Sequence, residues 1–336
     1  MLYHSCRCKI PPLFLRHGSL GKAPARSLIY LESQKIMRSV KIPFLLSLAV
    51  VVLLLCSACS EPEQKVRIES IRLQTTDGIW LNGILRQPHP NQTKAGVLMV
   101  HGYGGNFYSG IMSFLPEALA ENGFTTLAFN MRDHDLGPKK NLFEENLQDI
   151  AAGVDEMTRR RYKTLFLYGH SMGTNRVLYY LAETQDPRIT GIILTGPPGN
   201  LFQWNVRAFG LKAASEVLRR AQELRAAGKG ESWMLIDLGP LGKTLYTANH
   251  VVSLRGLKTR SDPFTNIAQI SRPVLIVHGL ADRLADPSVA DQLKNSDPRN
   301  NQIMVSKIAG ANHRFHNHEK ELEEVITRWL GEQLRQ

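Results

Sequence analysis

Short apolar runs recur along most of this chain, and amphipathic stretches separate them. Runs of four to six residues of this kind are typical of parallel strands that are buried on both faces. The stretches between them predict helices at about 111–121, 145–160 and 173–184. The pattern therefore predicts an α/β fold with a mostly parallel, doubly wound sheet. The predicted strands are residues 96–100, 124–129, 165–168, 189–194 and 273–277.

Three other segments complete this organisation. Residues 66–75 and 79–86 predict an antiparallel hairpin, because the turn sequence Thr76-Asp77-Gly78 joins them. The last section predicts a helix from about residue 287, a strand near 302–307 and a final helix over 319–334.

The alternation stops between Leu201 and Arg260. This segment carries helix-like pieces, such as Val206 to Ala227, and no strand is expected in it. It follows the end of a predicted strand, so it would cover the carboxyl edge of the sheet, where ligands bind in such folds. We therefore expect a domain over 66–336 with a helical cap inserted at about 200–262.

The amino-terminal 59 residues differ from the rest in composition. They hold all four cysteines and eight of the 41 Lys and Arg residues, but only one acidic residue, Glu32. Without them the formal net charge is +4 instead of +11, from 33 basic and 29 acidic residues. The basic character therefore lies largely in the leader, and no nucleic-acid partner is expected. The folded part has no cysteine and is expected to hold by packing alone.

Residues 37–59 have the organisation of an export signal. A basic segment, Met37 to Lys41, precedes an apolar run, Ile42 to Cys56, and small residues follow it. The run is shorter than the roughly 20 residues of a membrane-spanning helix. Ser57-Ala58-Cys59 resembles a bacterial lipobox, with Cys59 as the lipidated residue, although Cys56 stands where leucine is usual. A secreted form and an uncleaved signal anchor remain as alternatives.

The residues on either side of this signal have no expected fold of their own. Residues 1–36 are expected to be a non-native upstream extension or disordered, because an export signal works at an amino terminus, and Met37 is the expected start. Residues 60–65 are expected to be a charged linker. The predicted location is outside the cytoplasm, on a membrane-anchored lipoprotein.

A serine sits in a glycine-rich turn between a predicted strand and a predicted helix. The sequence Gly169-His170-Ser171-Met172-Gly173 is a G-x-S-x-G elbow in the strand–turn–helix context that the motif requires. The glycines allow strand and helix to approach closely, while the turn holds the serine in a strained conformation. This predicts that the Ser171 hydroxyl is held clear of the sheet.

Matching partners follow other predicted strands. Asp282 lies in His278-Gly279-Leu280-Ala281-Asp282, and His313 ends Gly310-Ala311-Asn312-His313. The order serine, aspartate, histidine is the one found in α/β-hydrolases. A glycine-rich segment, residues 101–105, follows the first parallel strand. Because the carboxyl ends of parallel strands share one edge, these groups are expected to meet there.

From about residue 66 to 336 the chain resembles the α/β-hydrolases, nearest to the capped esterases, lysophospholipases and monoacylglycerol lipases often grouped with serine aminopeptidases. The resemblance implies that the backbone N–H groups of Tyr103 and Met172 form an oxyanion hole. Thr174, where a second glycine often stands, and Asn106 after the glycine loop depart modestly from the family pattern.

These residues predict a serine hydrolase that cleaves carboxylic esters, with lipid-like acyl esters favoured. His313 would take the proton of Ser171, and Asp282 would orient the imidazole, so neither cofactor nor metal is expected. Aminopeptidase or amidase activity, and a non-catalytic binding lipoprotein, are the alternatives. The expected partners are an ester substrate and, through an anchor, the membrane; the oligomeric state is left open.

Several residues compete for these roles. Asp286 could replace Asp282, but it precedes Pro287 and fits a helix N-cap better. His316 and His318 lie at a predicted helix start and are less suitable than His313. His101 and His278 are expected to be structural, and His170 to pack beside the elbow. Asp133-His134-Asp135 is expected to be a solvated loop, because its spacing matches no zinc site.

The predicted cap is basic, with ten Lys or Arg residues against four acidic ones between Asn200 and Ser261. A solvated helix face above a few aromatic residues explains this composition without any function. The alternative hypothesis is that the cap covers an acyl pocket and that its charges favour anionic lipid or an anionic substrate head.

Overall fold

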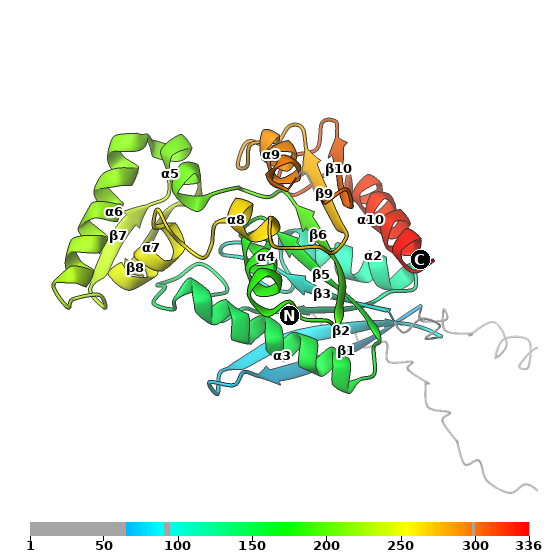
Figure 1. Cartoon of the computed structure of the whole chain (residues 1–336). Helices are drawn as coiled ribbons and strands as arrows, with labels where there is room; N and C mark the ends of the chain where they lie inside the picture. Colours follow the sequence, from blue (N-terminus) through cyan, green and yellow to red (C-terminus); the bar gives the residue numbers. More distant parts are fainter. Residues whose placement is uncertain (1–64, 91–94, 298–299, 336) are drawn as a thin grey trace, which may run out of the picture. The chain divides into compact units, whose positions relative to one another are not determined.

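An eight-stranded sheet forms the centre of the structure (Figure 1). The computed structural model describes residues 65–90, 95–297 and 300–335, and these belong to one compact unit, Gln64–Gln336. The spatial order is β1-β2-β4-β3-β5-β6-β9-β10. Strand β2 pairs antiparallel with both neighbours, and every other pairing is parallel. The strands are β1 (Val66–Gln74), β2 (Trp80–Pro88), β3 (Ala95–Val100), β4 (Thr125–Phe129), β5 (Thr164–His170), β6 (Ile189–Thr195), β9 (Val274–Gly279) and β10 (Ile303–Ile308).

Helices cover both faces of this sheet, which confirms the predicted doubly wound α/β fold. Helices α3 and α4 pack with α8 and α9 on one face, whereas α2 and α10 pack on the other. Figure 1 shows α2 beside α10 near the carboxyl terminus. The bounds are α2 (Leu115–Glu121), α3 (Asn146–Arg159), α4 (Met172–Thr184), α8 (Pro263–Ile267), α9 (Ser288–Ser296) and α10 (Glu319–Gln333); single 3-10 turns lie at Gly110–Ser113 and Phe143–Glu145.

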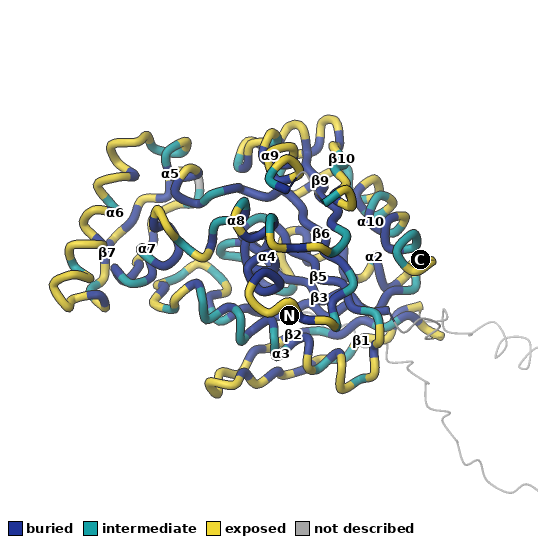
Figure 2. The backbone as a smooth tube through the Cα atoms, in the orientation of Figure 1, coloured by how far each residue is buried: buried dark blue, intermediate teal, exposed yellow. Residues whose placement is uncertain are grey.

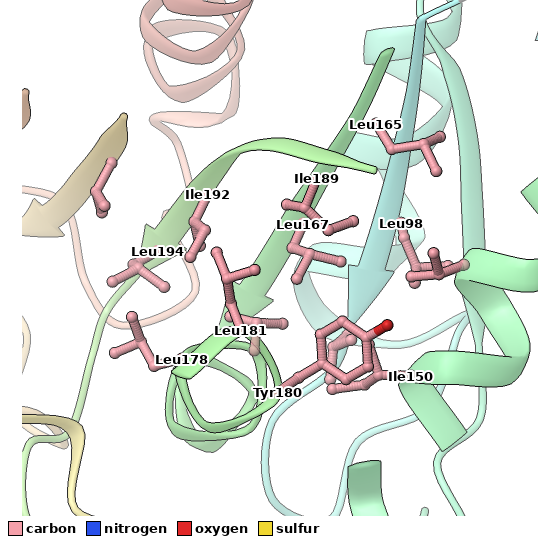
Figure 3. Close-up of a cluster of buried hydrophobic side chains, with 14 of the residues drawn as sticks. Leu98, Ile150, Leu165, Leu167, Leu178, Tyr180, Leu181, Ile189, Ile192 and Leu194 are labelled. Atoms are coloured by element: carbon pink, nitrogen blue, oxygen red, sulfur yellow. The ribbon is translucent and has the colours of Figure 1, made fainter. Parts of the chain in front are cut away.

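Alternate residues of each central strand enter the two opposite cores. In β5, Leu165 and Leu167 belong to the core under α3 and α4, while Phe166 and Tyr168 belong to the core under α2 and α10. Figure 3 shows side chains of β5 and β6 facing those of α4. The dark central strands in Figure 2 show the same burial. Burial on both faces explains why these strands are continuous apolar runs in the sequence.

The segment between β6 and β9 forms a cap of helices and a small hairpin. It contains α5 (Leu201–Phe209), α6 (Leu211–Ala226), β7 (Trp233–Asp237), a 3-10 turn (Gly239–Leu241), β8 (Lys243–Thr247) and α7 (Ala248–Arg255). Figure 1 shows these elements grouped to one side of the sheet. The cap has its own core, built on residues of α6, β7, β8 and α7.

Two expectations for the cap were wrong in detail. Helix 206–227 is in fact two helices, because Gly210 has a φ of 88° and ends α5 before α6 begins. The hairpin β7–β8 was not expected at all. In β7 only Met234 and Ile236 are buried, so this five-residue strand alternates between core and solvent and has no continuous apolar run.

Some expectations concern residues outside the described part of the chain. The extension 1–36, the signal 37–59 with Cys59 and the linker up to residue 64 all fall there, so they stay predictions. None of the helices in the described residues has both the length and the apolar content needed to cross a bilayer.

Candidate active site

The carboxyl ends of β3 and β5 lie next to each other at the point where the strand order changes direction. The chain passes from β3 outward to β4, and then returns to place β5 on the other side of β3. Such switch points leave a crevice above the strand ends, where ligands bind in open α/β sheets. The Gly102–Gly105 loop follows β3 and Ser171 follows β5, so the fold brings both to this crevice.

Ser171 occupies a strained turn between β5 and α4. Its φ is 52° and its ψ is −126°, a region that residues with a Cβ rarely adopt. Neighbouring glycines make room for the turn: a Cβ on Gly173 would collide with the carbonyl oxygen of Val100, and one on Gly102 would lie 2.8 Å from the Ser171 Cβ. The predicted elbow is therefore present, and its serine opens onto a cavity.

Asp282 and His313 form a hydrogen-bonded pair at the same edge of the sheet. The Nδ1 of His313 lies 2.7 Å from Oδ2 of Asp282. Asp282 follows β9 and His313 follows β10, and the two strands are parallel neighbours. Ser171 and His313 both line the cavity. The hydrogen bonds of the described residues join His313 to Asp282 but do not include one between Ser171 and His313.

Asp282 is held as a carboxylate by several donors. Burial alone would raise its pKa, but hydrogen bonds from His278, His313 and the backbone N–H of Ala285 lower that pKa below its usual range. The Nε2 of His278 lies 3.1 Å from the same Oδ2 that contacts His313. An acceptor-only carboxylate then favours donation from both imidazoles.

His278 is therefore more closely involved than the structural role expected for it. It is fully buried, and its Nδ1 has no hydrogen-bond partner among the described residues. This pattern fits the tautomer with hydrogen on Nε2. The only indication of this contact in the sequence was the spacing of four residues between His278 and Asp282 across a tight turn after a strand.

Tyr103 and Met172, whose backbone N–H groups are the expected oxyanion donors, both line the cavity together with Ser171. Met172 is the first residue of α4, so its N–H has no acceptor within the helix. Tyr103 lies in the turn closed by the hydrogen bond from Gly105 N to Gly102 O. Neither N–H donates a hydrogen bond to any described residue, and both residues line the cavity. The two donors are thus available to a negatively charged oxygen beside Ser171.

His101 anchors this loop. Its Nε2 accepts the N–H of Met131 at 3.0 Å, and its Nδ1 lies 2.8 Å from the carbonyl oxygen of Gly102. These partners fix the tautomer with hydrogen on Nδ1. Burial lowers the pKa of His101 to about 4, so the ring is neutral near pH 7. This agrees with the structural role expected for it.

His170 packs beside the pair formed by His313 and Asp282. Its ring centroid lies 4.9 Å from that of His313, and its Nδ1 lies 3.1 Å from Oγ1 of Thr195. Burial, followed by the nearby His313, lowers the pKa of His170 well below its usual value. A neutral ring at this position adds no charge next to His313.

The competing residues lie away from this arrangement. Asp286 accepts the N–H of Ser288 at 2.9 Å, at the start of α9. His316 and His318 lie just before α10, and neither lines the cavity. Of the candidates weighed in the sequence, the structure brings Ser171, Asp282 and His313 together and leaves these three apart.

Asp133 corrects the expectation of a solvated loop. It is buried and accepts hydrogen bonds from the guanidinium of Arg176 at 2.6 Å, while Arg176 also donates to the carbonyl oxygen of His101. Burial would raise the pKa of Asp133, but the Arg176 charge outweighs it and the pKa is lowered. Asp133 turns inward to pair with the buried Arg176 of α4, whereas His134 in the same loop is exposed, as expected.

The cavity has a volume of about 190 Å³ and lies between the strand ends and the cap. Its walls are mostly apolar, and the cap supplies Leu201, Trp204 and Leu241. The charged residues that line it are Arg255 and Arg314, and no acidic residue of the described chain does so. Within residues 65–90, 95–297 and 300–335, no three His, Cys, Asp or Glu side chains gather in a way that could hold a metal ion.

Comparison with known proteins agrees with this fold. Residues 91–238 match the family described as serine aminopeptidase, S33. Est1E from Butyrivibrio proteoclasticus superposes with a TM-score of 0.59 and 19% identity, over 80% of this chain and 99% of its own. The esterase Pf2001 from Pyrococcus furiosus has a TM-score of 0.57 and 17% identity, over 79% of this chain and 91% of its own.

A third solved structure belongs to the same group. The α/β-hydrolase GrgF from Penicillium sp. sh18 gives a TM-score of 0.61 at 16% identity, over 80% of this chain and 98% of its own. No curated protein sequence is significantly similar to this chain. The sheet, the helices on its two faces and the likeness to these solved structures lead to one conclusion: the chain has the α/β-hydrolase fold, and its residues 91–238 are similar to the family described as serine aminopeptidase, S33.

Proposed function

We propose that the protein hydrolyses carboxylic esters through an acyl-enzyme intermediate on Ser171. The observation that carries this proposal is the 2.7 Å hydrogen bond between His313 and Asp282 beside the same cavity onto which the strained Ser171 opens. The structural likeness to two esterases, Est1E and Pf2001, supports an ester as the substrate class.

Each group has a defined part in the proposed reaction. Ser171 Oγ attacks the ester carbonyl carbon, and its proton passes to Nε2 of His313. Asp282 keeps hydrogen on Nδ1 of His313 and stabilises the imidazolium that forms. The tetrahedral oxyanion accepts hydrogen bonds from the N–H groups of Tyr103 and Met172. His313 then protonates the leaving alcohol as the carbon–oxygen bond breaks.

Hydrolysis of the acyl-enzyme repeats these steps with water. His313 takes a proton from a water molecule, the hydroxide attacks the acyl carbon, and the oxyanion returns to the same two N–H donors. When the intermediate collapses, Ser171 Oγ leaves and regains its proton from His313. The hydrogen bonds from His278 and His313 outweigh burial and lower the pKa of Asp282, so the supporting carboxylate stays ionised throughout.

The walls of the cavity favour an apolar acyl group. Ile111, Met112, Leu201, Trp204 and Leu284 line it, and these side chains offer no hydrogen-bond acceptor for a polar chain. The proposed substrates are therefore esters whose acyl part is short enough for a cavity of about 190 Å³ or extends out between the cap and the sheet. A lipid ester would occupy the cavity through its acyl end.

Aminopeptidase activity is the second candidate, because the matching family is described as serine aminopeptidase. Such an enzyme must bind the protonated amino group of its substrate, which requires a carboxylate or several carbonyl oxygens near the nucleophile. The described cavity instead presents Arg255 and Arg314 and no acidic side chain. This charge distribution favours the ester over the peptide.

Active-site labelling and a substrate panel test the proposal together. A fluorophosphonate probe is expected to label the wild-type protein, while Ser171→Ala is expected to remain folded by circular dichroism and to lose the label. Ser109→Ala, a serine on the cavity wall, is the matched control and is expected to keep the label. Labelling of Ser171→Ala would refute the assigned nucleophile.

The same proteins are then assayed on p-nitrophenyl esters and on aminoacyl p-nitroanilides. Ester hydrolysis that is lost in Ser171→Ala is the expected result. Hydrolysis of the anilides at a higher kcat/KM than the esters would replace esterase by aminopeptidase. A protein that the probe does not label and that hydrolyses neither the esters nor the anilides would be a binding protein with this fold.

We also propose that the protein is exported and lipidated at Cys59, as the signal-like residues 37–59 indicate. Expression of the full-length gene with labelled palmitate in a bacterial host tests this. Labelling that Cys59→Ala removes is the expected result, and an unlabelled protein in the culture medium would favour simple secretion. The same sample, analysed by mass spectrometry, tests whether translation starts at Met37.

A further inference from the structure

Arg255 is a buried cation on the wall of the cavity without an acidic partner. It is the last residue of α7, and only 4% of its surface is exposed. Its Nη1 donates to the carbonyl oxygen of Leu201 at 3.2 Å and to Oδ1 of Asn205 at 2.8 Å. Its Nε has no hydrogen-bond partner among the described residues.

The other charged residues of the cap do not neutralise it. Ion pairs in the described part of the cap engage Arg219, Lys243 and Arg260, and none of them reaches Arg255. The ring of Trp204 lies 6.0 Å from the guanidinium carbon and gives only a weak cation–π contact. A guanidinium taken out of water in this way is unfavourable unless a negative charge joins it.

The Tyr246 hydroxyl lies close to this guanidinium and to the Tyr103 hydroxyl, and interacts with both. Tyr103 and Tyr246 pack in the same apolar cluster, and both hydroxyl oxygens are buried. Burial raises the pKa of Tyr246 well above its usual value, and the charge of Arg255 acts on it in the opposite direction. Tyr103 lines the cavity together with Arg255 and Ser171.

We propose that Arg255 binds a carboxylate of the substrate, so that the preferred substrates are esters carrying a free carboxylate away from the scissile bond. This rests on the proposed ester hydrolysis at Ser171. A carboxylate is the group that matches a guanidinium, because two of its planar donors can reach the two oxygens at once. Nη2 of Arg255 makes no hydrogen bond to a described residue and is available to the carboxylate, whereas Nη1 is engaged with Leu201 and Asn205 and Nε is buried.

A purely structural role is the alternative. Through Leu201 and Asn205, Arg255 ties the end of α7 to α5, so its loss could loosen the cap as a whole. That role would affect every substrate to a similar extent. Recognition of a carboxylate would affect only substrates that carry one, and the ratio of the two activities therefore distinguishes the roles.

The test compares matched substrate pairs. Mono-p-nitrophenyl adipate and p-nitrophenyl hexanoate have acyl chains of the same length and differ by a terminal carboxylate; 4-acetoxybenzoate and phenyl acetate place the same difference on the alcohol side. The wild-type protein is expected to have the higher kcat/KM for the charged member of at least one pair. In Arg255→Gln, that kcat/KM is expected to fall roughly 10- to 100-fold, the size of one charge-assisted hydrogen bond or ion pair.

Arg219→Gln is the matched control. It removes an exposed cap arginine that pairs with Glu216 and does not line the cavity, and it is expected to leave the ratio within each pair unchanged. Arg255→Lys keeps the charge without the planar fork and is expected to retain part of the preference. If Arg255→Gln does not fold, the ratio of kcat/KM within each substrate pair is measured on Arg255→Lys instead.

Distinct results overturn distinct claims. If wild type hydrolyses neutral esters but shows no preference in either pair, or if Arg255→Gln lowers both members of a pair equally, the carboxylate subsite is refuted while the esterase proposal stands. If wild type hydrolyses no ester at all, the esterase proposal fails, and the subsite fails with it.

Discussion

His278 Nε2 lies 3.1 Å from Oδ2 of Asp282, and both side chains are completely buried. The same oxygen accepts from Nδ1 of His313 at 2.7 Å, so a single carboxylate oxygen serves two imidazoles. His278 thus gives the carboxylate a second imidazole donor in addition to His313. A buried carboxylate that loses one donor is less well oriented and less stable as an anion.

Replacement of His278 is expected to weaken catalysis without weakening substrate binding. In His278→Leu, kcat for an ester is expected to fall about tenfold, close to the loss of one charge-assisted hydrogen bond, with little change in KM. His278→Gln can still donate to Asp282 and is expected to recover part of kcat. Steady-state kinetics of both variants give the comparison, and exposed His316→Gln serves as the control. An increase in KM at unchanged kcat would contradict this positioning role.

The strain at Ser171 predicts a stability difference between two inactive variants. With φ at 52°, a residue with a Cβ is held in a conformation that glycine adopts readily. Ser171→Gly is expected to be about 1 kcal/mol more stable to unfolding than Ser171→Ala, within the usual range for such strain. Urea denaturation followed by circular dichroism measures both. Equal midpoints would show that the elbow stores no strain at this residue.

The buried pair of Asp133 and Arg176 predicts an asymmetric response to mutation. Asp133→Ala leaves the Arg176 guanidinium buried without a counter-charge and is expected to lower the free energy of unfolding by about 3–5 kcal/mol. The double variant Asp133→Leu, Arg176→Met removes both charges and is expected to recover much of that loss. Chemical denaturation of the single and double variants measures the coupling.

An exposed ion pair is the control for this experiment. Glu216 and Arg219 lie 2.6 Å apart on the surface of α6. Glu216→Ala is expected to change the free energy of unfolding by less than about 1 kcal/mol. A loss as large as that of Asp133→Ala would show that charge pairing, and not burial, sets the size of the effect.

His250 predicts a loss of stability in mild acid. Burial lowers the pKa of His250 from 6.5 to about 4, although the hydrogen bond to the carbonyl oxygen of Asn141 acts in the opposite direction. Between these values the unfolded chain binds a proton that the folded protein does not, so stability falls as the pH decreases from 6.5 to 4. One such histidine contributes about 3 kcal/mol over this interval.

Comparison with His250→Gln isolates this contribution, because His101 has a lowered pKa as well. Unfolding free energies of wild type and variant, measured at pH 7 and pH 4.5, are expected to converge toward the lower pH. Parallel curves would mean that His250 titrates alike in both states and that its burial does not depress its pKa.

Much of the fold could be predicted because its central strands are buried on both faces. Residues such as those of β5 form continuous apolar runs, and the helices between them have one apolar side. The elbow could be predicted equally well, because the tight turn around Ser171 requires glycine at positions 169 and 173. These features depend on residues that are neighbours in sequence.

What escaped prediction depends on contacts between distant residues. The strand β7 is half exposed and only five residues long, so it carries no strong pattern within a helical segment. The sequence around Asp133 predicts a loop residue, but in the structure Asp133 is buried because it pairs with Arg176, 43 positions later. Arg255 lacks an acidic partner because of how the cap folds, and the spacing of charged residues in the sequence does not predict this.

The order of residues was enough to predict the strands of the central sheet, the elbow and the three residues proposed for catalysis, because spacing along a strand or around a tight turn limits the local backbone. The groups that surround them are visible only in the folded chain: the second imidazole on Asp282, the ion pair of Asp133 and Arg176, and Arg255 in the cavity without an acidic partner. Packing selects those partners by shape and by the need to compensate buried charge, and such selection acts across the fold.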